Sequence, residues 1–465
     1  AWVQFNLGSF YPISKITVFA RDAFGARLNN AQIFTSVNDM SQKMTNQLNA
    51  DPNVNVISPI NNLVNFPYGD PTIPVQKVDF QFLLQNIIAT ETVSGLSNST
   101  NATVNNNGTS GNDTIVGGDA DDHIDGGEGS DSISGGLGDD YLSGGQGSDT
   151  INGDDGFDMV SYREFNTQNQ TTATTGVIVN LSSGTATNGT ATDNWGNTDT
   201  LLSIEAVEGS DFNDSIVGSI GNEFLFGSQG NDTITGGGGS DHLQGGEGDD
   251  SITGGNGDDF ISGDQGNDIL IGGGGSDHIQ GGEGSDLITA VGAGDNFLSG
   301  DQGNDSISGG DGSDNIQGGD GDDSITGGSG DDFISGGAGI DTLTGGNGND
   351  IFALNLGSQS ISSSNVTDVI TDFARGSDKI DFGISSSVIQ FVSQTSVVSN
   401  LAALLTTVNG INDTAPNKTD GKILFYFGVV ASDGYLVTED DAGVINNIIK
   451  LSGVGTIAST DIVGI

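Results

Sequence analysis

A nine-residue period governs the centre of this chain and restricts its possible folds more than any other feature. From Asp113 to Asp158, and again from Asp214 to Asp350, an acidic residue or asparagine recurs at steps of nine, with a large apolar residue two positions later. One extra residue in TAVGAGDN shifts the phase once, just before Asn296. Glycines accompany each step. Self-similarity at a short fixed period is typical of solenoids, in which each repeat packs against its neighbours.

The repeat can be written GGxGxDxUx, where U is a large aliphatic residue, as in GGEGSDSIS at 126–134. Its glycines permit positive φ and close backbone approach, so several carbonyl groups can turn toward one point. The aspartate adds an anionic oxygen, and Ca²⁺ prefers six to eight oxygen ligands in flexible geometry. Two repeats would make one coil, with aspartates of successive coils sharing a cation and the U side chains filling a narrow core. The sequence therefore predicts an all-β chain, a parallel β-roll in two blocks, with multiple Ca²⁺ ions as cofactors.

The predicted metal ligands are the aspartates of the repeats. They are Asp113, Asp122, Asp131, Asp140, Asp149, Asp158, Asp214, Asp232, Asp241, Asp250, Asp259, Asp268, Asp277, Asp286, Asp305, Asp314, Asp323, Asp332, Asp341 and Asp350. Glu223 and Asn296 stand where an aspartate is expected, and Ala120 and Ala293 replace turn glycines, so calcium binding is expected to be weaker near these four positions.

The charge balance also points to cations as partners. There are 62 acidic residues against 11 Lys and Arg, a formal net charge of −51, and no Lys or Arg lies between Arg163 and Arg375. Nucleic acids and anionic membrane surfaces need basic patches, so neither is an expected partner. Without calcium, carboxylate repulsion and glycine entropy are expected to keep the repeats largely unfolded.

Several other classes of site receive little support. The chain has no cysteine, so it has no disulfide framework and no thiol chemistry. No run of 18 apolar residues predicts membrane insertion, and no basic-then-apolar signal peptide opens the sequence. His123, His242 and His278 each follow a repeat aspartate, and a solvent-facing ring beside a turn is favoured over a zinc or catalytic role. HExxH and GxSxG motifs are absent, so no enzyme activity is predicted.

Outside the repeats the composition changes, and six segments are expected. Residues 1–38 alternate as antiparallel strands of a partial β-sandwich, 39–110 form a Pro-rich connector and a polar linker, and 111–158 form the first roll block. The remaining segments are 159–210, spacer strands that continue the roll; 211–352, the second roll block; and 353–465, a β-rich cap and secretion-signal region with one short helix near 401–408.

Three stretches resemble known families. The GGxGxDxUx units resemble the RTX nonapeptide repeats, a calcium-binding β-helix pattern, which implies a secreted protein exported by type I secretion machinery. TDVITDFARGSDKIDF at 367–382 resembles the segment that follows such repeats in type I substrates, and the stretch from ILFYFGVVASDGYLVTED onward resembles the bluetail C-terminus of cyanobacterial surface proteins. WVQFNLGSFYPISKITVFA and the residues that follow it resemble part of a discoidin-like (factor 5/8 type C) sandwich, a family that often binds sugars.

These features predict a secreted structural protein of the cell surface, such as a surface-layer, sheath or filament subunit, that folds and self-assembles on binding Ca²⁺. Two alternatives stay open. One is a calcium-dependent adhesin that binds glycans through the discoidin-like part. The other is the secretion half of an exoenzyme or toxin.

Overall fold

The computed structural model describes residues 34–36, 54–56, 94–96, 105–163, 175–181, 188–354, 368–382, 389–398, 404–405, 423–439 and 445–463. The chain divides into two compact units, 1–91 and 92–465. In the first unit the described strands are β1 (Phe34–Ser36) and β2 (Val54–Val56), which pair antiparallel. The other residues of the predicted partial β-sandwich lie outside the described residues.

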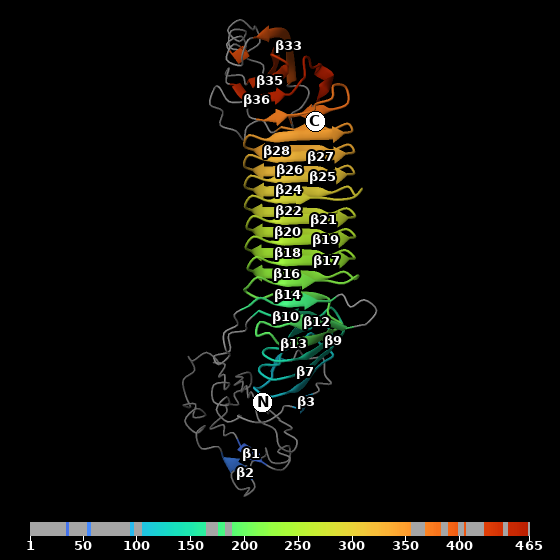
Figure 1. Ribbon diagram of the computed structural model, residues 1–465, viewed down its shortest axis with the longest axis vertical. Helices are drawn as coiled ribbons and strands as arrows, with labels where there is room; N and C mark the ends of the chain where they lie inside the picture. The colour runs from blue at the N-terminus through green and yellow to red at the C-terminus, as the bar shows by residue number, and fades with distance from the viewer. Residues whose placement is uncertain are drawn as a thin grey trace, which may run out of the picture. The chain divides into compact units, whose positions relative to one another are not determined.

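The second unit is a parallel β-roll, as the repeats predict, and its strands alternate between two sheets (Figure 1). Sheet 1 contains β3 (Ser94–Leu96), β5 (Thr114–Gly118), β7 (Ser132–Leu137), β9 (Thr150–Asp155), β15 (Ser215–Val217), β17 (Thr233–Gly238), β19 (Ser251–Asn256), β21 (Ile269–Gly274), β23 (Leu287–Thr289), β25 (Ser306–Asp311), β27 (Ser324–Ser329), β29 (Thr342–Asn347) and β31 (Val369–Ile370). Sheet 2 contains β4 (Asn105–Asn107), β6 (His123–Asp125), β8 (Tyr141–Ser143), β10 (Met159–Ser161), β14 (Ala206–Glu208), β16 (Phe224–Gln229), β18 (His242–Glu247), β20 (Phe260–Gln265), β22 (His278–Glu283), β24 (Phe297–Gln302), β26 (Asn315–Asp320), β28 (Phe333–Ala338), β30 (Ile351–Ala353), β32 (Lys379–Asp381) and β37 (Ile462–Val463).

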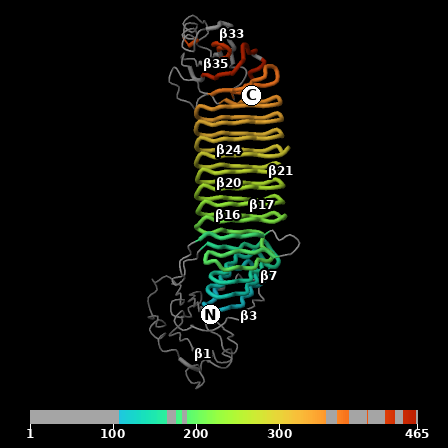
Figure 2. Tube along the Cα trace, viewed as in Figure 1, coloured from blue at the N-terminus to red at the C-terminus, as the bar shows by residue number. Residues whose placement is uncertain are grey.

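The register follows the period of the sequence. Within each block, a strand pairs parallel with the strand one coil later, so that Ile252 lies beside Leu270 in sheet 1 and Ile261 beside Ile279 in sheet 2. The inserted residue near 293 is absorbed between β23 and β24 without breaking either sheet, because β22 still pairs with β24 and β23 with β25. Figure 2 shows the result as a column of stacked coils.

The core of the roll is a double row of U side chains. Ile252, Ile261, Leu270 and Ile279 have no exposed surface, and one cluster contains the equivalent residues of both blocks. Each three-residue strand segment buries one side chain in the core. The apolar area of one side chain is too small to stabilise a single strand on its own. Stability must therefore come from stacking many coils.

The turn glycines are needed where coils approach closely. Gly255 has φ 122°, and a Cβ there would lie 2.1 Å from the carbonyl oxygen of Gly237 in the preceding coil. An L-residue would therefore meet both a strained backbone and a backbone clash.

The roll begins earlier than the sequence indicates. Strand β3 pairs with β5 and β4 pairs with β6, although residues through 110 are predicted as connector and linker. Parallel pairing requires only backbone N–H and C=O groups, so a stretch without the repeat consensus can still occupy a coil.

The spacer between the blocks inserts extra strands into sheet 1 alone. It contains β11 (Ile178–Asn180), β12 (Asn188–Thr192) and β13 (Thr198–Leu202). Strand β13 continues β9 in parallel, β12 runs antiparallel between β13 and β11, and β11 then pairs parallel with β15. In sheet 2 the single strand β14 joins β10 to β16, so both sheets cross from the first block to the second.

The C-terminal region is rich in strands: β33 (Ile389–Val398), β34 (Ile423–Val430), β35 (Asp433–Glu439), β36 (Ile445–Leu451) and a 3₁₀ turn at Ser459–Asp461. Strands β34, β35 and β36 form an antiparallel meander, and β36 pairs with β31 of the roll. Of the helix predicted near 401–408, Leu404 and Leu405 are described, and both are helical. In the described part of the chain, no helix has the length and apolar character needed to span a bilayer.

Candidate calcium sites

The structure stacks the repeat aspartates in two columns, one at each turn between the sheets. The backbone N–H of Asp250 donates to Oδ1 of Asp268 at 2.8 Å, and the N–H of Asp259 donates to Oδ1 of Asp277 at 3.0 Å. These side chains are almost fully buried; Asp250 and Asp259 are each 2% exposed. In these aspartates, one carboxylate oxygen thus accepts a hydrogen bond from the backbone of the preceding coil.

The second carboxylate oxygen, Oδ2, is buried and accepts no hydrogen bond in most repeats. This holds for Asp131, Asp140, Asp149, Asp158, Asp232, Asp241, Asp250, Asp259, Asp268, Asp277, Asp286, Asp305, Asp314, Asp323, Asp332, Asp341 and Asp350. A buried anionic oxygen without a donor or a cation costs several kcal/mol in a protein interior. A column of such atoms fits a row of bound cations.

Backbone carbonyl oxygens border the same space. A Cβ on Gly263 would lie 2.2 Å from Asp268 Oδ2 and 2.7 Å from the carbonyl oxygen of Gly281. The glycine therefore leaves a small gap lined by a carboxylate oxygen and a carbonyl oxygen from the next coil. Both are hard oxygen ligands of the kind that Ca²⁺ prefers.

At Asn296, which has no carboxylate, a side-chain N–H group occupies the position between the oxygen atoms. Its Nδ2 donates to the carbonyl oxygens of Gly294 at 2.9 Å and Gly309 at 3.4 Å, and to Asp314 Oδ1 at 2.9 Å. A donor with positive partial charge thus bridges the acceptors where other coils present only oxygen atoms. The residues present therefore fit a divalent cation, which would supply positive charge that holds two coils together.

No cluster of three or more His, Cys, Asp or Glu side chains suited to a metal occurs in the described parts of the chain. A cation in this roll would consequently draw most of its oxygens from backbone carbonyls. This matches the glycine content of the turns, because the carbonyls converge only where positive φ is tolerated.

The first aspartates of the two blocks differ from the others. Oδ2 of Asp113 accepts hydrogen bonds from Thr109 N at 2.6 Å and Thr109 Oγ1 at 2.8 Å, and Oδ2 of Asp214 accepts one from Ser210 N at 2.6 Å. Both carboxylates therefore already accept hydrogen bonds, unlike the Oδ2 atoms of most other repeats, and their role as calcium ligands stays a prediction. Glu223 is capped by Ser219 in a similar way.

Sequence reasoning missed four acidic residues that continue the columns. Asp199 and Glu205 accept the N–H groups of Asp149 at 2.9 Å and Asp158 at 3.0 Å across the spacer. Asp368 and Asp378 accept those of Asp341 and Asp350, both at 3.3 Å. Each of the four lies two positions before a buried aliphatic residue. An acidic residue followed by any residue and then an aliphatic one, without the glycines, would therefore have identified them in the sequence. The four tripeptides are Asp199-Thr200-Leu201, Glu205-Ala206-Val207, Asp368-Val369-Ile370 and Asp378-Lys379-Ile380.

The three histidines lie beside the calcium turns in sequence but outside them in space. His242 and His278 are separated by the ring of Phe260, whose centroid lies 4.7 Å from the first imidazole and 4.9 Å from the second. A zinc ion cannot bridge two imidazoles across an intervening ring. His123 stacks on Tyr141, with ring centroids 4.9 Å apart.

Burial raises the pKa of many repeat aspartates, among them Asp131, Asp149 and Asp250. The pKa is raised to about 7 for Asp131 and Asp250 and to about 8 for Asp149, mainly through desolvation, with neighbouring acidic residues adding to the effect. Without a cation these groups therefore hold protons more tightly in the fold than in an unfolded chain.

This shift predicts an unusual pH dependence. Because the folded pKa lies above the unfolded value near 3.8, the fold without calcium is stabilised at low pH, and that stability is lost as the pH rises through about 7. We expect more β-sheet circular dichroism at pH 5 than at pH 8 in excess chelator. With calcium present the trend should reverse, because protons then compete with the cation. Equal spectra at the two pH values in chelator would contradict the charge argument.

Two neighbouring aspartates provide a matched test of the ligands. Asp259→Asn keeps the Oδ1 acceptor but removes the anionic character of the orphaned Oδ2, so we expect fewer bound calcium ions by isothermal titration and a higher calcium midpoint for folding. Asp258→Asn makes the same charge change on an exposed side chain, whose Oδ1 accepts from Ser276 N, and should change neither value. The reverse substitution, Asn296→Asp, should add a calcium ion. Equal stoichiometry in Asp259→Asn and Asp258→Asn would rule out the buried column as the binding site.

The comparisons agree with this geometry. The family model of the RTX calcium-binding nonapeptide repeat matches residues 107–142, 125–160, 204–234, 235–270 and 262–290, and the model of the peptidase M10 serralysin C terminal matches residues 293–415. No curated protein matches the chain. Among solved structures, the extracellular lipase LipA from Serratia marcescens aligns at 16% identity over 77% of this chain, with a TM-score of 0.15. That likeness is too low to bear on fold or activity, and this chain spans 39% of the lipase.

The second family match overlaps the last repeats and extends through the segment 367–382, which resembles sequences that follow such repeats in type I substrates. Both matches lie outside the discoidin-like and bluetail-like stretches, and those two resemblances stay predictions. Repeat spacing, stacked coils and both matches together identify a secreted calcium-binding protein, built from RTX nonapeptide repeats with a serralysin-type C-terminal segment and exported as a type I secretion substrate.

Proposed function

We propose that this protein is a structural component of the cell surface, a subunit of a surface layer, sheath or filament, in which calcium held by the repeat aspartates converts a repulsive chain into a rigid roll. The observation that carries the proposal is the two columns of buried Oδ2 atoms, which run from Asp232 to Asp286 and, beyond Asn296, from Asp305 to Asp350. Cations in this column would join each coil to the next, so the roll would resist bending and shear.

A rigid roll suits assembly because its surface is regular. The same side-chain positions recur at each strand spacing of about 4.8 Å, so a contact made by one coil can be repeated by the next. Many weak and identical contacts along two rolls would add up to a stable lateral association.

A test of this function is electron microscopy of negatively stained protein with calcium and after addition of excess chelator. Ordered polymers or sheets that dissolve in chelator and return with calcium support the proposal. Particles that stay monomeric at high protein concentration in calcium, with the roll folded by circular dichroism, would refute it.

The serralysin C-terminal match favours a second candidate, the calcium-dependent secretion half of an exoenzyme. In that role the roll would fold outside the cell and support a catalytic part that the described residues do not display. Hydrolytic activity of the native secreted protein against casein or a triglyceride would favour this candidate over a structural role.

A further inference from the structure

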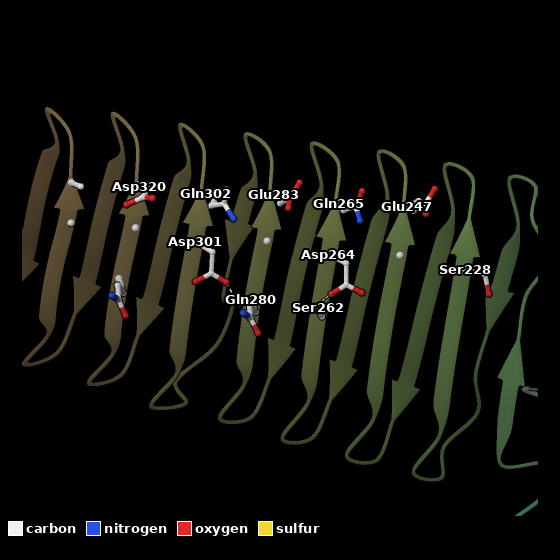
Figure 3. A pocket seen from close by; sticks show the side chains of 16 residues that line it. Ser228, Glu247, Ser262, Asp264, Gln265, Gln280, Glu283, Asp301, Gln302 and Asp320 are labelled. Atoms are coloured by element: carbon white, nitrogen blue, oxygen red, sulfur yellow. Dashed lines mark hydrogen bonds between the residues drawn. The ribbon is translucent and has the colours of Figure 1, made fainter.

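The outer face of sheet 2 differs from the rest of the roll. In strands β16 to β28 the second and fourth residues are buried, so the first, third and fifth residues face away from the core. We call the outward residues of β16, β18, β20, β22, β24, β26 and β28 the groove face. It includes a shallow hollow of about 830 Å³, bordered by Glu247, Asp264, Gln280 and Asp301 (Figure 3).

From β16 to β24 the side chains of this face repeat every second coil rather than every coil, whereas the fifth positions of β26 and β28 are both glycine, Gly319 and Gly337. The first position reads Phe224, His242, Phe260, His278 and Phe297, and the fifth position reads Ser228, Gly246, Asp264, Gly282 and Asp301. Strands in a sheet lie about 4.8 Å apart, so like side chains recur at about 9.6 Å. The roll can fold with side chains that are the same in every coil. The alternation over two coils is therefore not needed for folding, and it points to a ligand that repeats at the same spacing.

The opposite face lacks this pattern. The outward residues of sheet 1 in β17, β19 and β27 are mostly Ser, Thr and Gly, such as Thr233, Thr253 and Thr326. Both sheets share the same backbone, core and turns. The chemistry of the groove face is thus additional to what the roll needs.

Two aspartates of the groove face occupy positions where neighbouring coils have glycine. Asp264 and Asp301 both have φ 72°, while Gly282 at the equivalent position has φ 116°. A non-glycine residue at positive φ is strained and persists only where its surroundings hold it, as they also do for Asp154 of sheet 1, with φ 71°.

Both carboxylates are held in the same way. Ser262 Oγ donates to Asp264 Oδ1 at 2.6 Å and Gln244 Nε2 donates to Asp264 Oδ2 at 2.5 Å. Ser299 Oγ and Gln280 Nε2 donate to the two oxygens of Asp301 at 2.7 and 2.5 Å. Figure 3 shows Ser262 and Asp264, and Gln280 and Asp301, on the outer side of the strands. Each fixed carboxylate retains lone pairs for donors on a ligand.

The rings beside the hollow form a continuous stack. Centroids of successive rings from Phe224 to Phe297 lie 4.7 to 5.2 Å apart, with interplanar angles of 5° to 18°. Because the rings stack along the roll, their edges face outward, and the edges of His242 and His278 carry the imidazole nitrogens. The row therefore offers apolar edges alternating with hydrogen-bonding groups.

The charge of the face limits the ligand. Glu247, Glu283 and Asp320 also border the hollow, and no Lys or Arg occurs between Arg163 and Arg375, so anionic polymers and a second copy of the same face would be repelled. A neutral polymer rich in hydroxyl groups has the donors that the carboxylates and amide oxygens accept. An extended chain of sugar rings also repeats at about the two-coil spacing.

From this geometry we infer that the groove face binds a neutral linear polysaccharide, laid along the roll with its hydroxyl groups donating to Asp264 and Asp301. The residues of this site are not those of the calcium columns, nor the N-terminal residues that resemble a sugar-binding family. It also goes beyond the proposed structural function, since a roll could be rigid without it.

Affinity electrophoresis of the full chain in calcium can test the inference, with hydroxyethyl cellulose, galactomannan, alginate or chitosan in the gel. The double variant Asp264→Gly, Asp301→Gly restores the residue of neighbouring coils, so its roll should fold normally. The matched control is Asp154→Gly, which removes an aspartate with φ 71° from sheet 1, where Ser134 and Asn152 hold it.

Retardation by a neutral polymer is expected for the parent chain and for Asp154→Gly, with binding about tenfold weaker or more in the double variant. Circular dichroism and the calcium midpoint should be the same in all three proteins, which separates loss of the ligand site from loss of the roll. Retardation by alginate or chitosan alone, equal retardation of the double variant, or no retardation by either neutral polymer would overturn the inference.

Discussion

Addition of excess chelator at pH 8 is expected to abolish most of the β-sheet circular dichroism of the roll, and calcium should restore it. The reason is local. Most coils bring buried carboxylates next to those of neighbouring coils, and in these the Oδ2 atom has no hydrogen-bond donor. In place of a positive charge, the next coil offers another aspartate. The second block has no basic side chain to neutralise these carboxylates, because no Lys or Arg lies between Arg163 and Arg375.

The glycines make the loss more complete. Glycine loses more conformational freedom on folding than any other residue, and this chain has 77 of them. The double row of core side chains has to offset that entropy together with the carboxylate repulsion. Without cations the two unfavourable contributions act together, so we expect the calcium-free repeats to be unfolded rather than loosened.

Salt and magnesium provide the controls for this experiment. Sodium chloride at 1 M shortens the Debye length to about 3 Å and screens general repulsion, but it cannot supply ligands to a buried oxygen. Magnesium demands tighter octahedral geometry and sheds its water reluctantly, so it should fit the carbonyl-lined gaps poorly. If either one restores the spectrum as well as calcium does, general screening would explain folding, and specific sites would not be needed.

The repeat made most of the roll predictable from the sequence. The step of nine residues places Asp250, Asp259 and Asp268 at turns, and the residue two positions later in the core, as the structure shows. The nine residues of one repeat contain the turn glycines, the aspartate and the core residue. Each repeat therefore forms the same surroundings for the repeat that stacks on it. The same argument explains why the one-residue insertion near 293 was harmless: it lies in a turn, where no strand register depends on it.

The parts that could not be predicted are those where geometry persists after the consensus is lost. Asp199 and Glu205 continue the two columns across the spacer because β13 and β14 pair with β9 and β10, and that pairing uses backbone atoms that carry no sequence signal. The antiparallel pairing of β12 with β11 and β13 also uses backbone atoms, so the sequence did not predict it either. Conversely, Asp113 fits the consensus but is capped by Thr109, because it lies at the start of a block.

The second large effect is expected in the core, where two neighbouring residues of β21 allow a matched comparison. Leu270 has no exposed surface and packs between the sheets, whereas Ile269 beside it is 45% exposed on the outer face of sheet 1. Both are large aliphatic residues on the same strand, with the same backbone pairing to β19. A difference in unfolding free energy between alanine variants of the two residues therefore measures the effect of burial.

Leu270→Ala should destabilise the calcium-loaded roll by about 2–5 kcal/mol, the range found when a buried leucine is truncated and leaves a cavity. Ile269→Ala removes exposed surface only, so the change in unfolding free energy should stay within about 0.5 kcal/mol. Chemical unfolding with guanidinium chloride in saturating calcium, followed by circular dichroism, measures both values.

The two variants also separate core packing from metal binding. Both leave every aspartate and turn glycine in place, so the number of bound calcium ions should stay the same, while the calcium midpoint should rise for Leu270→Ala because each binding event must then offset a weaker core. Since coils in a solenoid are coupled mainly to their neighbours, the transition of Leu270→Ala should also broaden as the halves on either side of β21 unfold less cooperatively. Equal stability of the two variants would mean that the aliphatic rows contribute little and that the cation columns alone hold the coils together.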